Sequence, residues 1–255
     1  MAEAIVSRLL QQEIYQSSQV LISEPVGSRR EYWQNQYQVS TTDQNQEIID
    51  SCAVVLLAIK PQIFALVTSQ LNIDKSINSP LVLSILAGVN LTTLAGAFAG
   101  LSIVRVMPNT PALVGEGMSA FATNDLVTDS EKQTATSLLE AIGSVIEVNE
   151  SMMDAVTGLS GSGPAFIALM IEALADGGVL CGLPRAIALQ LATQTVIGTG
   201  ELVKQKNLHP AVLKDQVTSP GGTTIAGVSQ LEANGFRNSV ISAVKAAYQR
   251  SQELS

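Results

Sequence analysis

Residues 218–224 read Thr-Ser-Pro-Gly-Gly-Thr-Thr and stand directly before a segment of helical pattern. Glycine backbone lets a ligand come close, and the first N–H groups of a helix have no partner within the helix. Such a segment suits an anion, either a carboxylate or a phosphate. The same residue types also make an ordinary turn with a helix cap, because Ser and Thr are preferred caps. The segment alone favours the turn, so the choice depends on the rest of the chain.

A second segment, GLSGSGPAF at 158–166, repeats this combination of small and hydroxyl-bearing residues before a helix. Ser160, Ser162 and Gly163 precede Pro164, and proline is well tolerated as the first residue of a helix. A plain helix cap explains Ser162 and Pro164 equally well. These residues are therefore candidates for lining a binding site, with a cap as the alternative.

Two more polar segments follow runs that are typical of buried strands. LAIKP places Ala58, Lys60 and Pro61 at the end of one run, and MPNTP places Asn109 at the end of another. In open α/β sheets, ligands bind at the carboxyl ends of the strands. The alternatives are a solvated loop lysine for Lys60 and a turn residue between two prolines for Asn109.

The composition argues against several kinds of chemistry. A net charge of −8 without a run of Lys or Arg argues against a nucleic-acid partner. Cys52 and Cys181 lie far apart and His209 is the single histidine, so the sequence suggests neither a metal site nor a Ser-His mechanism. No continuous apolar run reaches the roughly 18 residues of a membrane span, and the first residues do not resemble a signal peptide. A cytoplasmic protein without a membrane partner is expected.

The first half of the chain alternates short apolar runs with helical stretches. The runs are hydrophobic on nearly every residue, which is typical of strands covered on both faces in a parallel sheet. This order predicts a doubly wound, Rossmann-like α/β domain over residues 1–149. The expected strands are 19–24, 53–59, 81–87, 101–107, 117–123 and 144–149, and the expected helices are 28–37, 44–51, 61–71, 91–98 and 129–142.

The second half, residues 150–255, has a helical pattern throughout. Several of its segments are apolar nearly all round, as in FIALMIEALA and IALQLATQTVIG, and leave no broad polar face. A region of this size has few layers in which to bury that surface, so we expect a second copy of the chain to bury it. We expect an all-α domain that forms a homodimer. The expected helices are 163–182, 184–205, 210–218, 223–235 and 236–253.

The first residues pose a separate question. Ala2, Ile5, Val6, Leu9 and Leu10 recur at helical spacing, so the chain starts in a helix without a preceding strand. In a dinucleotide-binding fold, a central strand and a GxGxxG turn precede this helix and hold the pyrophosphate. We therefore expect that the chain lacks the first strand and the glycine-rich turn.

The chain resembles the pyrroline-5-carboxylate reductase family, whose members catalyse the last step of proline biosynthesis. The segments that carry the resemblance are VTSPGGTTIAGVSQLE, GLSGSGPAF, LAIKPQ and RVMPNTP. The match runs over essentially the whole chain in order, and the Ser-Pro-Gly-Gly-x-Thr segment is its most specific part. The resemblance implies a dinucleotide-binding domain at 1–149, incomplete at its N-terminus, and a helical substrate and dimerisation domain at 150–255. Assemblies of several dimers occur in this family, and the sequence does not decide their number.

The resemblance also implies roles for the residues before two of the helices. Hydride passes from a reduced nicotinamide to the C=N carbon of a cyclic imine that carries a carboxylate, and the nitrogen takes a proton. Gly221, Gly222 and Thr223 would present N–H groups to the carboxylate, with Ser219 adding a hydroxyl. Thr224 would be the catalytic hydrogen-bond donor or proton relay, with a chain of water as the alternative source because an alcohol is a poor free acid. Ser162 and Gly163 would help to bind the substrate.

On the cofactor side, the resemblance assigns Ala58, Lys60, Pro61 and Asn109 to the dinucleotide, and Ala2 to the last small position of the glycine-rich turn. Ser23, Arg29 and Arg30 would suit the 2′-phosphate of NADPH, although the two arginines also fit an exposed helix start. Glu24 is the kind of residue that favours NADH instead. NADPH is the expected cofactor, with NADH as the alternative.

Two other interpretations remain at this stage. A related reductase that acts on a hydroxy acid or another imine would use a helix lysine as its acid, and the predicted helix 163–182 contains none. A non-catalytic dimeric binding protein with a degenerate cofactor domain would fit the expected loss of the first strand. The SPGGTT, LAIKP and MPNTP segments argue against it.

Overall fold

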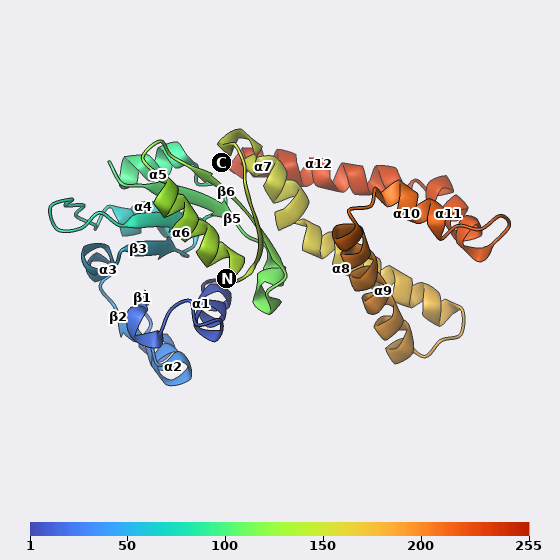
Figure 1. Ribbon diagram of the computed structural model, residues 1–255, viewed down its shortest axis with the longest axis horizontal. Coiled ribbons are helices and arrows are strands. Elements are labelled where there is room, and N and C mark those ends of the chain that lie inside the picture. The colour runs from blue at the N-terminus through green and yellow to red at the C-terminus, as the bar shows by residue number, and fades with distance from the viewer. Residues whose placement is uncertain (255) are drawn as a thin grey trace. The chain divides into compact units, whose positions relative to one another are not determined.

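The computed structural model describes residues 1–254, which form two compact units (Figure 1). The first unit comprises residues 1–161 and the end of the chain from Ala247 onward. The second unit comprises Ser162–Ala246. The last helix of the chain begins in the second unit and ends in the first.

A five-stranded sheet forms the centre of the first unit, in the order β3 (Val54–Leu57), β4 (Leu81–Ser84), β5 (Ile103–Met107), β6 (Gly117–Thr123) and β7 (Gly143–Glu147). Its pairs are parallel except for β5 and β6, which are antiparallel. The expectation of a wholly parallel sheet is therefore wrong at this pair. The short 3₁₀ turn Thr110–Val114 joins the two strands, and a parallel connection needs a crossover of a dozen residues or more.

Two further strands, β1 (Leu21–Ser23) and β2 (Ser40–Thr42), form a separate parallel pair. The strand β2 was not predicted, because Ser40, Thr41 and Thr42 contain no apolar run. Among the described residues, no strand pairs with the second edge of β1 or with that of β3. In the strand order of doubly wound folds, a central strand lies between these two positions.

Helices cover both faces of the sheet, which explains why its strands are apolar on nearly every residue. One face packs Val104 and Val106 against Ile5 and Leu139, and the other packs Val82 and Ile103 against a second set that includes Leu94 and Phe98. The helices of this unit are α1 (Ala2–Gln11), α2 (Gly27–Tyr37), α3 (Asn45–Ser51), α4 (Phe64–Thr68), α5 (Leu91–Ala97), α6 (Asp129–Glu140) and α7 (Met153–Val156).

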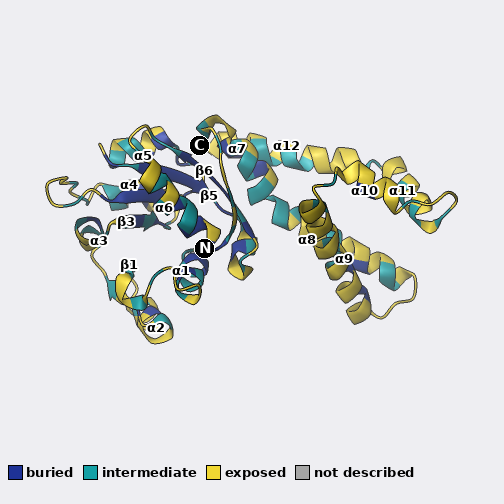
Figure 2. Ribbon diagram, viewed as in Figure 1, coloured by how far each residue is buried: buried dark blue, intermediate teal, exposed yellow. Residues whose placement is uncertain are grey.

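The second unit consists of helices, and its internal packing is thin. Ala175, Ala188 and Ala192 form the buried contact between α8 and α9. By contrast, Leu169 is 65% exposed and Leu180 is 89% exposed, and Figure 2 shows the helices of this unit mostly in the colour of exposed residues. The helices are α8 (Gly163–Leu180), α9 (Arg185–Lys206), α10 (Pro210–Gln216), α11 (Thr223–Ala233) and α12 (Phe236–Leu254).

Candidate active site

The start of α11 is open rather than capped by a side chain. Gly222 occupies the N-cap position in an extended conformation, and within the described residues no side chain accepts a capping hydrogen bond there. Gly221 has a φ of +67°, in the left-handed region that favours glycine. A Cβ on Gly222 would collide with Ser219 Oγ, so a larger residue here would displace that hydroxyl from the start of the helix. The N–H groups of the first turn of α11 therefore have no side-chain cap among the described residues.

Ser162 precedes α8 without capping it. Its backbone is already in the right-handed helical region, and no side-chain cap bond forms at this residue among residues 1–254. The preceding turn, Thr157–Gly161, is a π-helical turn in which the Thr157 hydroxyl donates to the Met153 carbonyl. Turns of this kind are rare and are frequent at functional sites. Gly163 begins α8 and lies next to Pro164 at its first turn.

Four of the residues expected near the dinucleotide lie at the ends of β1 and β3. Ser23 ends β1, and its hydroxyl donates to Asn45 Oδ1 at 2.7 Å. Ala58, Lys60 and Pro61 follow β3, with Lys60 exposed at the start of a 3₁₀ turn. Asn45 was not among the predicted site residues, because it follows β2, which has no apolar signal of its own. A polar residue at the start of the predicted helix 44–51 is the signal that could have found it.

Both arginines at the start of α2 have partners within the chain. Arg29 pairs with Glu3 at 3.1 Å and stands over the Tyr32 ring, 4.6 Å from its centroid. Arg30 Nη1 donates to the Glu24 carbonyl at 2.7 Å and so holds the loop after β1. The Glu24 carboxylate accepts from Val26 N in the same loop.

Glu3 lies in the first turn of α1, next to Ala2, and its carboxylate accepts hydrogen bonds from Arg29, Tyr32 and Tyr37. The Tyr32 hydroxyl donates to Glu3 at 2.6 Å and the Tyr37 hydroxyl at 3.1 Å. The hydrogen bond from Tyr32 is the main cause that lowers the pKa of the Glu3 carboxyl, and Arg29 lowers it further. Burial, followed by the bonds to Tyr32 and Glu3, raises the pKa of Tyr37 to about 12.

Asn109 lies just after β5, and its side-chain amide is hydrogen-bonded at both atoms. Oδ1 accepts from Met118 N at 2.9 Å, and Nδ2 donates to the carbonyl and the hydroxyl of Ser160. The structure thus connects two residues that the sequence had singled out separately.

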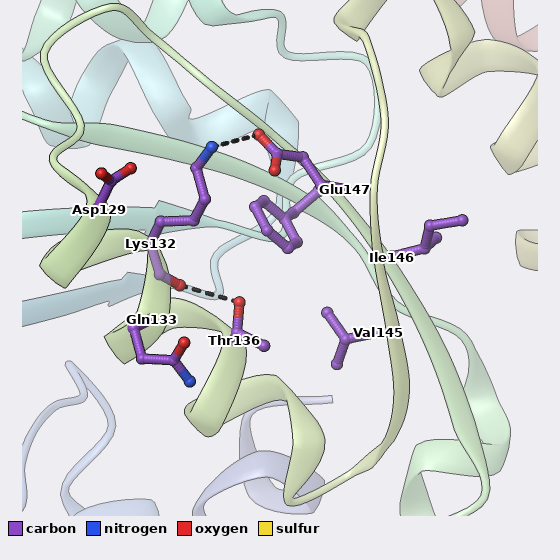
Figure 3. Close-up of a pocket in the computed structure, with 8 residues that line it drawn as sticks. Asp129, Lys132, Gln133, Thr136, Val145, Ile146 and Glu147 are labelled. Carbon is purple, nitrogen blue, oxygen red and sulfur yellow. Dashed lines mark hydrogen bonds and ion pairs between the residues drawn. The ribbon is translucent and has the colours of Figure 1, made fainter.

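A surface hollow of about 370 Å³ lies beside α6 and β7 (Figure 3). Lys132 spans it and pairs with Glu147 at 2.7 Å. None of the site residues predicted from the sequence lines this hollow. Within the described residues there is also no group of His, Cys, Asp and Glu that could hold a metal ion. The lining residues are Phe121, Asp129, Lys132, Gln133, Thr136, Val145, Ile146 and Glu147.

The chain combines an α/β unit that has polar residues after its strands with a helical unit that has an open, glycine-rich helix start. This combination defines a class of nicotinamide-dependent oxidoreductases. The comparisons with known proteins agree. Residues 1–88 match the family described as NADP oxidoreductase, coenzyme F420-dependent, and residues 150–254 match the family described as pyrroline-5-carboxylate reductase dimerisation.

Relatives over the full length identify the family. The chain is 55% identical to the pyrroline-5-carboxylate reductase of Synechocystis sp. over 254 residues, covering 100% of this chain and 94% of that relative. The solved reductase of Coxiella burnetii superposes with a TM-score of 0.91 at 33% identity, covering 100% of this chain and 94% of the other. The Plasmodium falciparum enzyme, solved with NADP bound, gives 0.87 at 33% identity, covering 99% and 93%. This chain belongs to the pyrroline-5-carboxylate reductase family.

The family assignment settles the class of reaction. The chain is an oxidoreductase that reduces 1-pyrroline-5-carboxylate to proline with NAD(P)H, so the interpretations as a binding protein and as another imine or hydroxy-acid reductase are wrong. The helical region is a dimerisation domain. One stretch of the described helices, Glu150–Leu180, is long and apolar enough to cross a membrane by length and composition. It falls inside the region matched by the dimerisation family, and a protein interface accounts for its apolar surface.

Proposed function

We propose that residues 219–224 bind the substrate by its carboxylate and orient its C=N bond for reduction by NADPH. The observation that carries this proposal is the open start of α11, where Gly222 leaves the first N–H groups without a side-chain cap among the described residues. The N-terminal end of a helix favours an anion by about 0.3–1 kcal/mol, and by more where the charge is partly buried. Ser219, Gly221, Gly222 and Thr223 are the carboxylate-binding residues in this proposal, and Ser162 and Gly163 are a second substrate-binding group.

Thr224 is the proposed catalytic residue, because it stands in the first turn of α11 beside the carboxylate site. Its hydroxyl would donate a hydrogen bond to the imine nitrogen, which becomes more basic as the carbon receives hydride. An alcohol does not ionise near neutral pH, so Thr224 would pass on a proton from water rather than supply its own. The bound nicotinamide supplies the hydride.

Two positively charged side chains and two polar ones support NADPH as the preferred cofactor. Ser23 and Asn45 are hydrogen-bonded at the end of β1, where a doubly wound fold binds the adenine ribose. Arg29 and Arg30 lie in the first turn of α2, which follows β1 in the chain, and would pair with a 2′-phosphate. Ala2, Ala58, Lys60, Pro61 and Asn109 complete the expected cofactor set. The Plasmodium falciparum relative, solved with NADP bound, is consistent with this preference.

The proposed assembly is a homodimer formed through the helical domain, with assemblies of several dimers as a further step. The support is the exposed apolar surface of the second unit, which includes Leu169, Leu180 and Ile197. The proposed domain boundary lies between residues 149 and 150, where the match to the dimerisation family begins. Cys52 and Cys181 are free thiols in the structure, in keeping with a reducing, cytoplasmic location.

The test is oxidation of NADPH by the purified chain, with 1-pyrroline-5-carboxylate added or withheld. Substrate-dependent oxidation and proline as the product are expected, with a higher kcat/KM for NADPH than for NADH. A Thr224→Val variant should lose most of kcat, and Thr199→Val, which removes a hydroxyl bonded to the Thr195 carbonyl in α9, should retain it. Equal turnover by both variants would contradict the role of Thr224, and equal kcat/KM for the two cofactors would contradict the NADPH preference.

A further inference from the structure

The side-chain amide of Asn109 connects three segments of the first unit. Oδ1 accepts from Met118 N in β6 at 2.9 Å, while Nδ2 donates to Ser160 O at 3.2 Å and to Ser160 Oγ at 3.3 Å. Asn109 itself follows β5, and Ser160 lies in the π-helical turn. One residue therefore ties the ends of two strands to the turn that precedes α8.

The orientation of this amide follows from its partners. A backbone N–H can only donate, so the atom that faces Met118 must be the amide oxygen. The amide nitrogen then faces Ser160, and its two hydrogens have two acceptors there, the carbonyl and the hydroxyl oxygen. Because Ser160 Oγ accepts in this bond, the hydrogen of the Ser160 hydroxyl points elsewhere and can be donated to a further acceptor.

The π-helical turn also rests closely on the end of β5. A Cβ on Gly161 would come within 2.7 Å of Met107 Cε, so the turn lies directly against the Met107 side chain. Met107 is the last residue of β5, and Asn109 stands two positions later. The turn is thus placed by packing at Met107 and by hydrogen bonds at Asn109.

We propose that Asn109 is a positioning residue that acts through Ser160. It holds the π-helical turn in place and leaves the Ser160 hydroxyl as a hydrogen-bond donor to an acceptor atom of the bound substrate or cofactor. This role belongs to the side-chain amide and is additional to the cofactor contact proposed above for Asn109. The inference rests on the proposed function, because Ser160 stands two positions before Ser162, which is assigned there to substrate binding.

The decisive variant is Asn109→Asp. It keeps the size of the side chain and the oxygen that accepts from Met118, but it places a charged acceptor where Ser160 needs a donor. We expect kcat/KM to fall about 10- to 100-fold at neutral pH, in line with the cost of small errors in positioning. A protonated carboxyl can donate again, so the difference in kcat/KM between the variant and the unchanged protein should narrow as the pH is lowered. A role in stability alone would not produce that pH dependence of kcat/KM.

Asn124→Asp is the matched control. Asn124 makes the same kind of bridge beside the opposite end of β5: Oδ1 accepts from Ile103 N, and Nδ2 donates to Leu101 O, each at 3.0 Å. This variant should lower the melting temperature and leave kcat/KM of the folded protein unchanged. The proposal would be overturned by an equal loss of kcat/KM in both variants or by an unaltered kcat/KM in Asn109→Asp. It would also be overturned if the difference in kcat/KM between Asn109→Asp and the unchanged protein did not narrow at low pH.

Ser160→Ala tests the hydroxyl by itself, because it removes Oγ and keeps the carbonyl that Asn109 contacts. A raised KM for 1-pyrroline-5-carboxylate would assign the hydroxyl to the substrate, and a raised KM for NADPH would assign it to the cofactor. Unchanged values of KM and kcat would overturn the donor role.

Hydrogen exchange separates this proposal from the proposed function. In the full chain without ligands, Asn109→Asp should speed exchange of the Gly161 and Ser162 amides, while Asn124→Asp should not. Exchange at the turn that is the same in both variants would overturn the positioning role whatever the turnover. Lack of turnover by the unchanged protein would refute the proposed function, and the exchange experiment would still decide the role of Asn109.

Discussion

The two units bury apolar surface in different ways. In the first unit, Leu94, Phe98 and Ile103 are fully buried between a sheet and its helices. In the second unit, the buried apolar cluster consists of alanines, while leucines on the same helices are exposed. The first unit therefore buries its core within one chain. The second unit exposes apolar surface of the kind that is found in the interfaces of stable dimers.

The largest effect is expected in the first unit. Leu94 is 0% exposed, and Leu94→Ala removes its side chain from the core between α5 and the sheet. Such a cavity costs about 2–5 kcal/mol of unfolding free energy. Urea denaturation at two protein concentrations should show the same loss at both. A loss that depends on concentration would place Leu94 in an interface instead.

The next effect concerns assembly. Leu169 is 65% exposed in α8, and Leu169→Asp would put a carboxylate in the proposed interface. We expect self-association to weaken by about 100-fold, because a charge is costly to bury without a partner. Leu66, 61% exposed in α4 of the first unit, offers the matched control Leu66→Asp. Sedimentation should show dissociation for the first variant alone; dissociation of both, or of neither, would break the contrast between the units.

A smaller effect separates function from stability within the second unit. Gly222→Ala pushes Ser219 away from the start of α11, and we expect the KM for 1-pyrroline-5-carboxylate to rise about tenfold, through the loss of oriented N–H donors. Gly227→Ala lies in the same helix, and its Cβ would meet nothing within 4 Å. That control should keep its KM and gain up to about 1 kcal/mol in stability, because alanine favours helix over glycine. An unchanged KM in Gly222→Ala would show that this loop does not bind the substrate carboxylate.

The smallest effect is electrostatic. The pKa of the Glu3 carboxyl is lowered in the folded state, so its contribution to stability is present at neutral pH and is lost as the pH falls below about 4.3 toward the folded-state value. Glu3→Gln should cost less than about 1 kcal/mol at pH 7, because the Arg29 pair is well exposed. The difference in urea midpoint from the unchanged protein should shrink in acid. A constant difference across pH would rule out the ionised carboxylate as its source.

Sequence patterns located most of the elements, since periodicity is a local property. The runs at 117–123 and 101–107 became β6 and β5, and each predicted helix of the second half has a counterpart within a few residues. The strand β2 was missed, since three hydroxyl-bearing residues carry no burial signal. The antiparallel pairing of β5 and β6 was also missed, because the direction of a strand depends on its connection and its neighbours rather than on its own residues.

By itself, the sequence determined the order of strands and helices, the family, and hence the reaction, because hydrophobic spacing and the SPGGTT, LAIKP and MPNTP segments are all local patterns. The tertiary structure alone decided that Gly222, rather than a residue with a hydroxyl side chain, occupies the N-cap position of α11, and that the Ser162 side chain makes no capping bond in the described chain. It also decided that Asn109 bonds to Ser160, which lies 51 residues away along the chain. Such contacts depend on where distant backbone segments meet, and no local pattern records that.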